Sequence, residues 1–223
     1  MSRAEVVPSS PFASLKLEQR TAKRRLIEAA AARVFAEKGY RHATVADVAR
    51  AAGISAGAIY LYFASREDLL FATVVAEVDA LEQRMRASVD PSLPADVALR
   101  SMMDAYRDYA LERPEGFRML TAGLEREARL KADPALVEEY NRRALGCLEL
   151  LHEVMEQGIA DGTLREGDAW ELTHAVWGAC HGLLVVCLAQ SPDRFVGFEV
   201  RRLFDRAADG LLFGIATTEE RDH

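Results

Sequence analysis

Apolar residues recur along most of this chain at the three- and four-residue spacing of amphipathic helices. Residues 45–52 show the pattern in its shortest form, with Val45, Val48, Ala49 and Ala52 on one stripe. Similar stripes recur from residue 16 onward, without the alternation of a strand and without an internal repeat. The pattern predicts an all-α fold of nine helices, at about residues 16–38, 45–52, 56–63, 65–89, 95–112, 114–130, 133–160, 168–189 and 191–215.

Three helix starts follow one another closely between residues 44 and 69. Thr44 is followed by Asp47, and Ser65 by Asp68, which in both cases is the spacing of a capping box. Ser55 lies between the two pairs and is a good N-cap residue. These signals predict a short helix, a tight turn, a second short helix and then a longer one.

The turn between the two short helices carries signals of its own. Gly53 follows the first stripe and can adopt the left-handed conformation that a helix C-terminus needs. Ile54 and Ile59 flank the cap as a hydrophobic staple. A helix-turn-helix joined by a glycine-containing turn binds DNA when its second helix is free to enter the major groove.

The run GISAGAIYLYFASREDL, residues 53–69, resembles the DNA-binding segment of TetR-type transcriptional regulators. Including residues 26–40 extends the resemblance over the first three helices. The turn at residues 161–168, and Trp177 followed by His181 and Gly182, resemble a C-terminal subgroup of that family with the pattern Trp-x-x-x-His-Gly. The resemblance implies a nine-helix architecture with a small DNA-binding head and a larger body that binds a ligand and dimerises.

The domains expected from this resemblance are a disordered arm at residues 1–15, a helix-turn-helix head at 16–64 and a helical body at 65–218. The implied function is that of a bacterial, cytoplasmic repressor released from a palindromic operator by a small apolar or aromatic effector. Its partners would be double-stranded operator DNA, the small-molecule effector and a second copy of the chain, with no membrane. The alternative is a helical adaptor that binds another protein through the stripe at residues 200–215.

Matching the family position by position gives the expected DNA contacts. The residues expected to contact the bases have few hydrogen-bonding side-chain groups. Sequence specificity would therefore depend on apolar contacts with thymine methyl groups and on DNA shape. This chain departs from the family at Ala56, where a basic or polar residue is common, and at Ala58, where a hydroxyl is common. The expected base contacts are Ala56, Gly57, Ala58 and Leu61, and the expected phosphate contacts are Thr44, Ser55, Tyr60, Tyr62 and Arg66.

The body contains aromatic, methionine and histidine side chains that suit a cavity for an apolar or aromatic molecule. Each of them alone is more simply interpreted as a core residue. For His181 three roles remain open, in the order core residue, interface residue and ligand donor. The candidate pocket residues are Met103, Tyr106, Phe117, Leu120, Tyr140, Trp177 and His181.

A single recognition helix reads too few base pairs to be selective, so we expect a dimer. The last two helices carry the candidate interface and would form a four-helix bundle with their copies. Small residues four apart would allow close helix approach, and an apolar stripe would supply the seam. The candidate interface residues are Gly178, Gly182, Leu203, Phe204, Ala207 and Leu211.

The net charge of −7 argues against DNA binding until it is divided along the chain. Residues 1–70 hold 11 Lys and Arg against 7 Asp and Glu, a net charge of +4, whereas residues 71–223 hold 17 against 28, a net charge of −11. The basic cluster of Lys16, Arg20, Lys23, Arg24 and Arg25 at the start of the first helix is expected to contact phosphates.

The remaining composition argues against other classes of protein. Three scattered cysteines without a Cys-x-x-Cys pair indicate a reducing compartment, and we expect no metal site and no cofactor. Neither a signal peptide nor a long uncharged apolar run is expected. Cys180 and His181 are neighbours on a helix and point about 100° apart, so they do not suggest a catalytic pair or an enzyme.

Overall fold

The computed structural model describes residues 11–189 and 199–217 of the 223-residue chain. Within these ranges the chain forms ten helices, and its only β-type pairing is an isolated bridge between Leu164 and Ala216. The all-α fold is therefore confirmed. The helices are α1 (Pro11–Lys38), α2 (Val45–Ala52), α3 (Ala56–Ile59), α4 (Arg66–Ser88), α5 (Ala95–Glu112), α6 (Pro114–Gly123), α7 (Arg126–Lys131), α8 (Pro134–Ala160), α9 (Ala169–Ala189) and α10 (Val200–Ile215).

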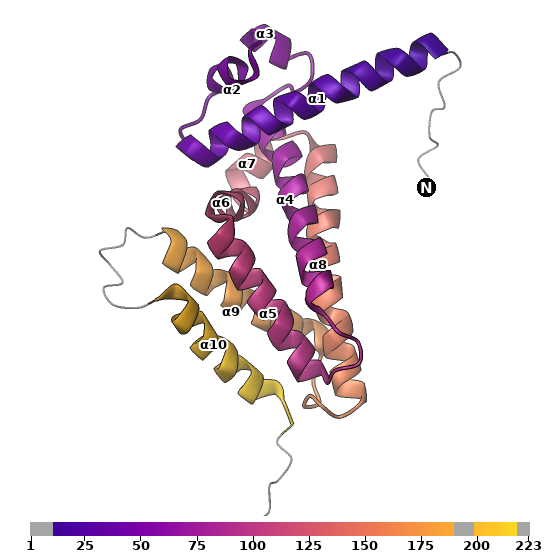
Figure 1. Cartoon of the computed structure of the whole chain (residues 1–223), viewed down its shortest axis with the longest axis vertical. Coiled ribbons are helices and arrows are strands. Elements are labelled where there is room, and N and C mark those ends of the chain that lie inside the picture. The colour runs from indigo at the N-terminus through magenta and orange to yellow at the C-terminus, as the bar shows by residue number, and fades with distance from the viewer. Residues whose placement is uncertain (1–10, 190–198, 218–223) are drawn as a thin grey trace, which may run out of the picture.

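The helices divide into a small head and an elongated body (Figure 1). Helices α1, α2 and α3 lie together at one end, with α1 crossing the top of the body. Helix α4 leaves this head and runs beside α8 and α5, while α9 and α10 lie on the far side of α5. One helix, α4, therefore extends from the head into the middle of the body.

Helix α1 is longer than the sequence predicts. It begins at Pro11, so residues 11–15 of the expected arm are helical, and residues 1–10 lie outside the described part of the chain. Leu26 is an apolar residue of this helix, yet it is 69% exposed. Its neighbour Ile27 is buried, and since adjacent helical positions point about 100° apart, Leu26 is directed toward solvent.

The helix predicted at residues 114–130 is divided into α6 and α7. Leu124 is the last residue with helical backbone angles, and Glu125 adopts an extended conformation before α7 begins. Arg129 donates a hydrogen bond of 3.3 Å to the Gly123 carbonyl, one of the groups that a helix C-terminus leaves without a partner. The break turns Ala128 of α7 into the core.

Helix α9 corrects the expectation that the chain has no long apolar run. Ala169–Leu188 is long and apolar enough to cross a membrane by length and composition, with a mean hydropathy of 1.3. Only 22% of its most apolar window is buried within the chain. The helix packs on α5, α8 and α10 with one face. Its other, largely apolar face is therefore not covered by the described residues.

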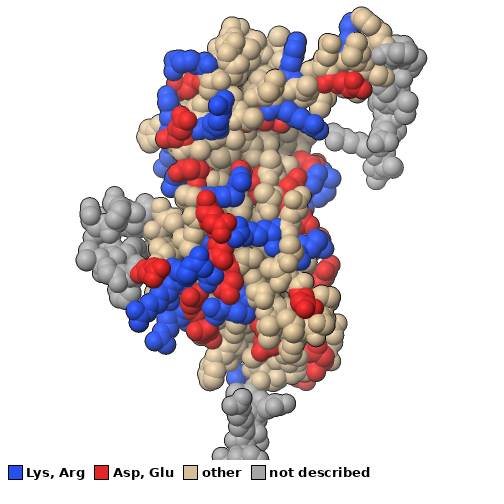
Figure 2. Space-filling model, in the orientation of Figure 1, with Lys and Arg blue, Asp and Glu red and all other residues tan. Residues whose placement is uncertain are grey.

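Ion pairs fasten α10 to α5, and they form the mixed band of basic and acidic residues at the lower left of Figure 2. Arg107 of α5, whose side chain is 7% exposed, contacts Asp104 and Asp108 of its own helix and Asp205 of α10. Arg201 of α10 returns the contact by pairing with Asp108 at 2.7 Å. These pairs set the position of α10 on the body.

The start of α10 differs from the sequence prediction. The helix expected to open at Ser191 begins at Val200, after Glu199 in an extended conformation, and residues 190–198 lie outside the described part of the chain. The described part of the predicted stripe, residues 200–215, is helical throughout.

Candidate DNA interface and ligand cavity

The helix-turn-helix is fixed by its caps. Thr44 and Asp47 form a reciprocal capping box at the start of α2, and Gly53 ends that helix in the left-handed region with φ of 69°. The Ser55 hydroxyl oxygen accepts a hydrogen bond of 3.2 Å from the Ala58 backbone. Helix α3 ends at Ile59, earlier than predicted, and a turn carries the chain on to Phe63.

The α3 segment separates a buried side from an exposed side. Ile59 and Phe63 are 0% and 2% exposed and anchor the segment in the core. Tyr60 and Leu61 are 54% and 73% exposed, and the Tyr60 hydroxyl has no partner among the described residues. Gly57 is also exposed, so the segment presents a nearly uncharged face to solvent.

The predicted phosphate-contacting residues differ in whether their hydroxyl groups still have a proton available for a hydrogen bond to DNA. The Ser55 hydroxyl accepts one bond and keeps its proton available for a phosphate oxygen. The Thr44 hydroxyl instead donates to Asp47 at 2.7 Å. A hydrogen bond from Lys38, joined by those from Thr44, lowers the pKa of the Asp47 carboxyl, which keeps this acceptor ionised.

Arg66 is occupied inside the head. Its guanidinium donates to the Ala43 carbonyl at 3.3 Å and to Glu67 at 3.2 Å, and it lies 4.6 Å from the centre of the Tyr40 ring. Tyr40 completes the group by donating to the same Glu67 carboxylate. The structure therefore assigns Arg66 to bracing α4 against the loop before α2, in place of the free phosphate anchor expected from the sequence.

The basic residues at the start of α1 differ in whether their charged groups contact other side chains of the head. Arg24 pairs with Glu28 and lies over the Phe63 ring, and Arg20 lies over the Tyr62 ring. Lys23 and Arg25 are exposed and form no ion pair within the described residues. These two cations remain available for phosphates.

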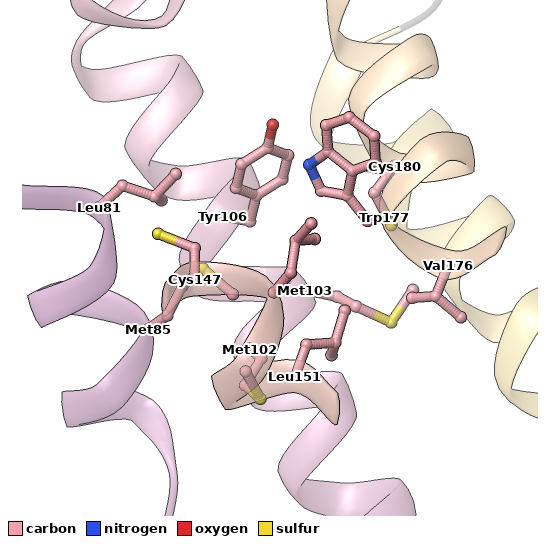
Figure 3. Close-up of a pocket in the computed structure, with 11 residues that line it drawn as sticks. Leu81, Met85, Met102, Met103, Tyr106, Cys147, Leu151, Val176, Trp177 and Cys180 are labelled. Carbon is pink, nitrogen blue, oxygen red and sulfur yellow. The ribbon is translucent and has the colours of Figure 1, made fainter. Parts of the chain in front are cut away.

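Two adjoining cavities lie in the body between α4, α5, α8 and α9. The smaller, of about 40 Å³, is shown in Figure 3, where Tyr106 and Trp177 lie side by side above Met102, Met103 and Leu151. The larger, of about 470 Å³, extends toward α6 and α7. The two cavities share the residues Leu81, Tyr106, Cys147, Leu148 and Trp177.

Most of the predicted pocket residues line these cavities. Phe117 does not; it packs behind them, against the rings of Tyr106 and His181. The sequence missed the contribution of α4 and most of that of α8, because their apolar residues look like ordinary core positions. The predicted residues that line a cavity are Met103, Tyr106, Leu120, Tyr140, Trp177 and His181. The residues missed include Val78, Leu81, Met85, Met102, Leu124, Arg129, Asn141, Leu145, Cys147, Leu148, Leu151, Val176 and Cys180.

Tyr106 and His181, which both line the larger cavity, form a hydrogen-bonded pair. The Tyr106 hydroxyl lies 2.6 Å from Nδ1 of His181, whose ring stacks on Trp177 at 5.3 Å. Burial raises the pKa of Tyr106 well above its usual value and lowers the pKa of His181, so both groups are neutral. We assign Tyr106 as the donor, which leaves the Nε2–H group of His181 free to donate.

The comparisons with known proteins match this architecture over both parts of the chain. Residues 27–73 match the family described as bacterial regulatory proteins, tetR family, and residues 99–211 match the tetracyclin repressor-like C-terminal domain. The second match alone covers more than half of the chain. The chain belongs to the TetR family.

Its relatives in this family are transcriptional regulators. A fatty acid metabolism regulator protein of Bacillus subtilis is 28% identical over 68% of this chain and 75% of its own length. The transcriptional repressor KstR2 of Mycobacterium tuberculosis is 32% identical over 63% of this chain and 68% of its own. The chain is accordingly a ligand-responsive, DNA-binding regulator of transcription.

Solved structures share the fold at lower identity. The regulator FadR from Bacillus subtilis, in complex with stearoyl-CoA, superposes with a TM-score of 0.68 at 22% identity, covering 85% of this chain and 98% of that one. The TetR family regulator PfmR from Thermus thermophilus gives a TM-score of 0.66 at 24% identity, covering 85% of this chain and 97% of that one. The nine-helix architecture expected from the family is present with one helix more, the separate α7.

The predicted interface residues of this TetR-family chain fall into three groups by exposure. Gly178 and Gly182 of α9 are exposed, and a Cβ atom added at either would meet nothing within 4 Å. Ala207 of α10 is exposed as well. Phe204, in contrast, is 1% exposed and lies against Arg107 inside the chain, so it is core and not part of an outer seam. Leu203 and Leu211 are half-buried.

The cysteines of the body lack the properties of a catalytic thiol. Burial raises the pKa of Cys147 and of Cys180 to about 12. A thiolate is the nucleophilic form of cysteine, so neither residue supplies one at neutral pH. His181 is hydrogen-bonded to Tyr106 and not to Cys180, in line with the regulatory role of the family.

Proposed function

We propose that this chain is a homodimeric repressor that binds a palindromic operator and leaves it when a small apolar molecule fills the cavity of the body. The observation that carries the proposal is the course of α4. This helix begins at Arg66, braced against the head, and lines the cavity with Val78 and Leu81. Any change of its tilt that accompanies filling of the cavity is transmitted to the recognition segment.

The head, residues 16–64, would bind DNA through the exposed α3 segment. Ser55, Tyr60 and Tyr62 would hold phosphates, with Lys23 and Arg25 adding charge. The Leu61 side chain would contact thymine methyl groups, flanked by Ala56, Gly57 and Ala58. Thr44 and Arg66 would act by positioning these groups rather than by contacting the DNA.

The body, residues 65–218, would dimerise through the outer faces of α9 and α10. The exposed stripe of α9 consists of small and apolar residues, Ala175, Gly178, Ala179, Gly182 and Val186. Such a stripe favours close packing of a second helix, and the exposed Glu171 and His174 at its start disfavour lipid. A four-helix bundle of two α9 and two α10 helices would cover the apolar face, and we propose a cytoplasmic location.

The Trp-x-x-x-His-Gly pattern would place the chain in a subgroup of the family. Its residues lie on two faces of α9, one toward the cavity and one toward the proposed dimer interface. Trp177 and His181 line the cavity, whereas Gly182 lies on the outer face. Ligand site and dimer seam thus lie back to back on one helix. This arrangement supports a ligand that acts on the dimer as a whole.

Direct contacts between body and head support the coupling. Arg41, in the loop after α1, pairs with Glu125 before α7 at 3.0 Å. The Asp68 carboxylate at the start of α4 accepts a hydrogen bond of 2.7 Å from the Asp133 backbone before α8. The mainly apolar lining supports an effector with a large apolar part, in agreement with the fatty acid regulator and the stearoyl-CoA complex among the similar proteins.

The Tyr60→Phe variant tests the DNA interface. Removing the hydroxyl should weaken operator binding about tenfold, because a hydrogen bond to a charged group contributes roughly 1.5–3 kcal/mol. The melting temperature should stay unchanged, since the hydroxyl has no partner within the described chain. Fluorescence anisotropy with a labelled operator measures the effect.

The matched control is Tyr106→Phe, which removes a hydroxyl from the cavity and should leave operator affinity in the absence of ligand unchanged. Equal operator affinity of Tyr60→Phe and the natural protein would remove Tyr60 from the interface. Failure of the natural protein to prefer any duplex over random sequence would favour the protein-binding adaptor.

A further inference from the structure

The cavity has a charged opening. We propose that Arg129 binds the negatively charged group, a carboxylate or a phosphate, of an amphiphilic effector whose apolar part fills the body cavity. This inference rests on the proposed function, since it names the chemical class of ligand at the same site. It adds a specific polar contact on α7, a helix absent from the sequence prediction.

Charge is scarce around the larger cavity. Its volume of about 470 Å³ lies in the range of roughly 300–1,000 Å³ that small-molecule sites occupy. Among the described residues that line it, Arg129 is the only one with a permanent charge, because His181 is neutral. The other lining side chains are mainly aliphatic and aromatic, so an apolar ligand has a single cation to meet.

The exposure of the lining residues locates the opening. Tyr106, Leu120 and Tyr140 are buried and form the inner wall. Leu124 and Leu145 are 44% and 45% exposed and form an apolar rim between the end of α6 and α8.

Arg129 is half-buried and donates to the exposed Asn141 of the same lining at 2.6 Å. The cation therefore lies where a ligand held by its apolar part would keep its polar end.

Arg129 is held in place without being neutralised. Its donors go to the Gly123 carbonyl and the Asn141 side-chain oxygen, and its guanidinium lies 5.7 Å from the centre of the Tyr140 ring. No carboxylate forms an ion pair with it in the part of the chain that the structure describes.

Several other arginines of the body are paired with carboxylates, as Arg113 is with Glu77 and Arg143 with Asp79. A positioned guanidinium that lacks a carboxylate partner is suited to bind an anion through two parallel hydrogen bonds.

The test is the affinity of three probes that share one alkyl chain: dodecanoate, dodecyl phosphate and dodecan-1-ol. Isothermal titration calorimetry on the full chain should show that at least one anion binds about tenfold more tightly than the alcohol. In Arg129→Gln this preference should disappear while the alcohol binds as before. In Arg129→Lys, which keeps the charge, part of the preference should return.

Arg126→Gln is the matched control, because it removes the same charge from the same helix at an exposed position outside the cavity. It should keep the preference for anions. Equal binding of the three probes to the natural protein would overturn the inference, as would a preference that survives in Arg129→Gln or the absence of binding by any probe.

Operator affinity, measured in parallel, distinguishes a failure of the Arg129 inference from a failure of the proposed repressor function. A protein that binds its operator and releases it with dodecan-1-ol, but shows no preference for anions, would retain the proposed function and lose this inference. If Arg129→Gln lowered the melting temperature and kept the preference, Arg129 would be only a cap for α6.

Discussion

A glutamate at position 182 should convert the dimer into a monomer and abolish operator binding. Gly182 lies on the exposed stripe of α9, where an added Cβ atom meets no atom of the described residues within 4 Å. The single chain should therefore fold normally. In the bundle the added carboxylate would be buried without a partner and would hold the two α9 helices apart.

The loss of one half-site should weaken operator binding by about a hundredfold or more, because the specific affinity of a dimeric regulator depends on both recognition segments. Sedimentation velocity and operator binding measure the two effects. Leu93→Glu places the same charge on another exposed apolar residue, away from the proposed seam, and should remain dimeric. A Gly182→Glu protein that stays dimeric at micromolar concentration would show that the chains associate elsewhere.

Replacing Arg107 with methionine should be the most destabilising single change in the ion pairs of the body. The Arg107 side chain is 7% exposed and contacts three carboxylates, of Asp104, Asp108 and Asp205. Removing one partner of a fully buried ion pair costs roughly 3–5 kcal/mol. Here the cost should be smaller, because the three carboxylates are 26–37% exposed and keep Arg100 or Arg201 as partners. Chemical denaturation should show a loss of about 2 kcal/mol in the free energy of unfolding.

Arg201→Met is the control for this change. Its side chain is 45% exposed and shares Asp108 with Arg107, so its loss should cost less than about 1 kcal/mol. The difference between the two losses of stability distinguishes the largely buried Arg107 ion pairs from an ordinary surface ion pair. Equal effects of the two substitutions would mean that the α5–α10 contact is held by Phe204 and its apolar neighbours alone.

Local signals in the sequence predicted the turn of the head, although not the start of α1 or the end of α3. Caps such as Thr44 with Asp47, and Gly53 after α2, act over a few residues, and the structure has them where the spacing predicts. The break after Gly123 was not predictable in this way. It depends on Arg129 reaching back to a free carbonyl and on Ala128 finding the core, which are contacts that no spacing reveals.

The site was predictable only in part, for a related reason. Helical periodicity tells which residues point inward, but not which inward face meets a neighbour and which meets a cavity. Phe204 and Gly182 both lay on plausible seams, and only the packed chain shows that Phe204 is covered by α5 while Gly182 is uncovered. Likewise, the bracing contacts of Arg66 with Ala43 and Tyr40 are known only from the folded structure, because these residues are distant in sequence.

The central claim is that DNA and ligand compete through one conformational equilibrium of this chain. The most direct test is the affinity for dodecanoate, measured with and without a saturating operator duplex obtained by selection from random sequences. Linkage requires each ligand to weaken the other by the same factor, typically about 5- to 150-fold. We predict that saturating operator lowers dodecanoate affinity by the factor by which dodecanoate lowers operator affinity; an affinity for dodecanoate that operator leaves unchanged would contradict the account.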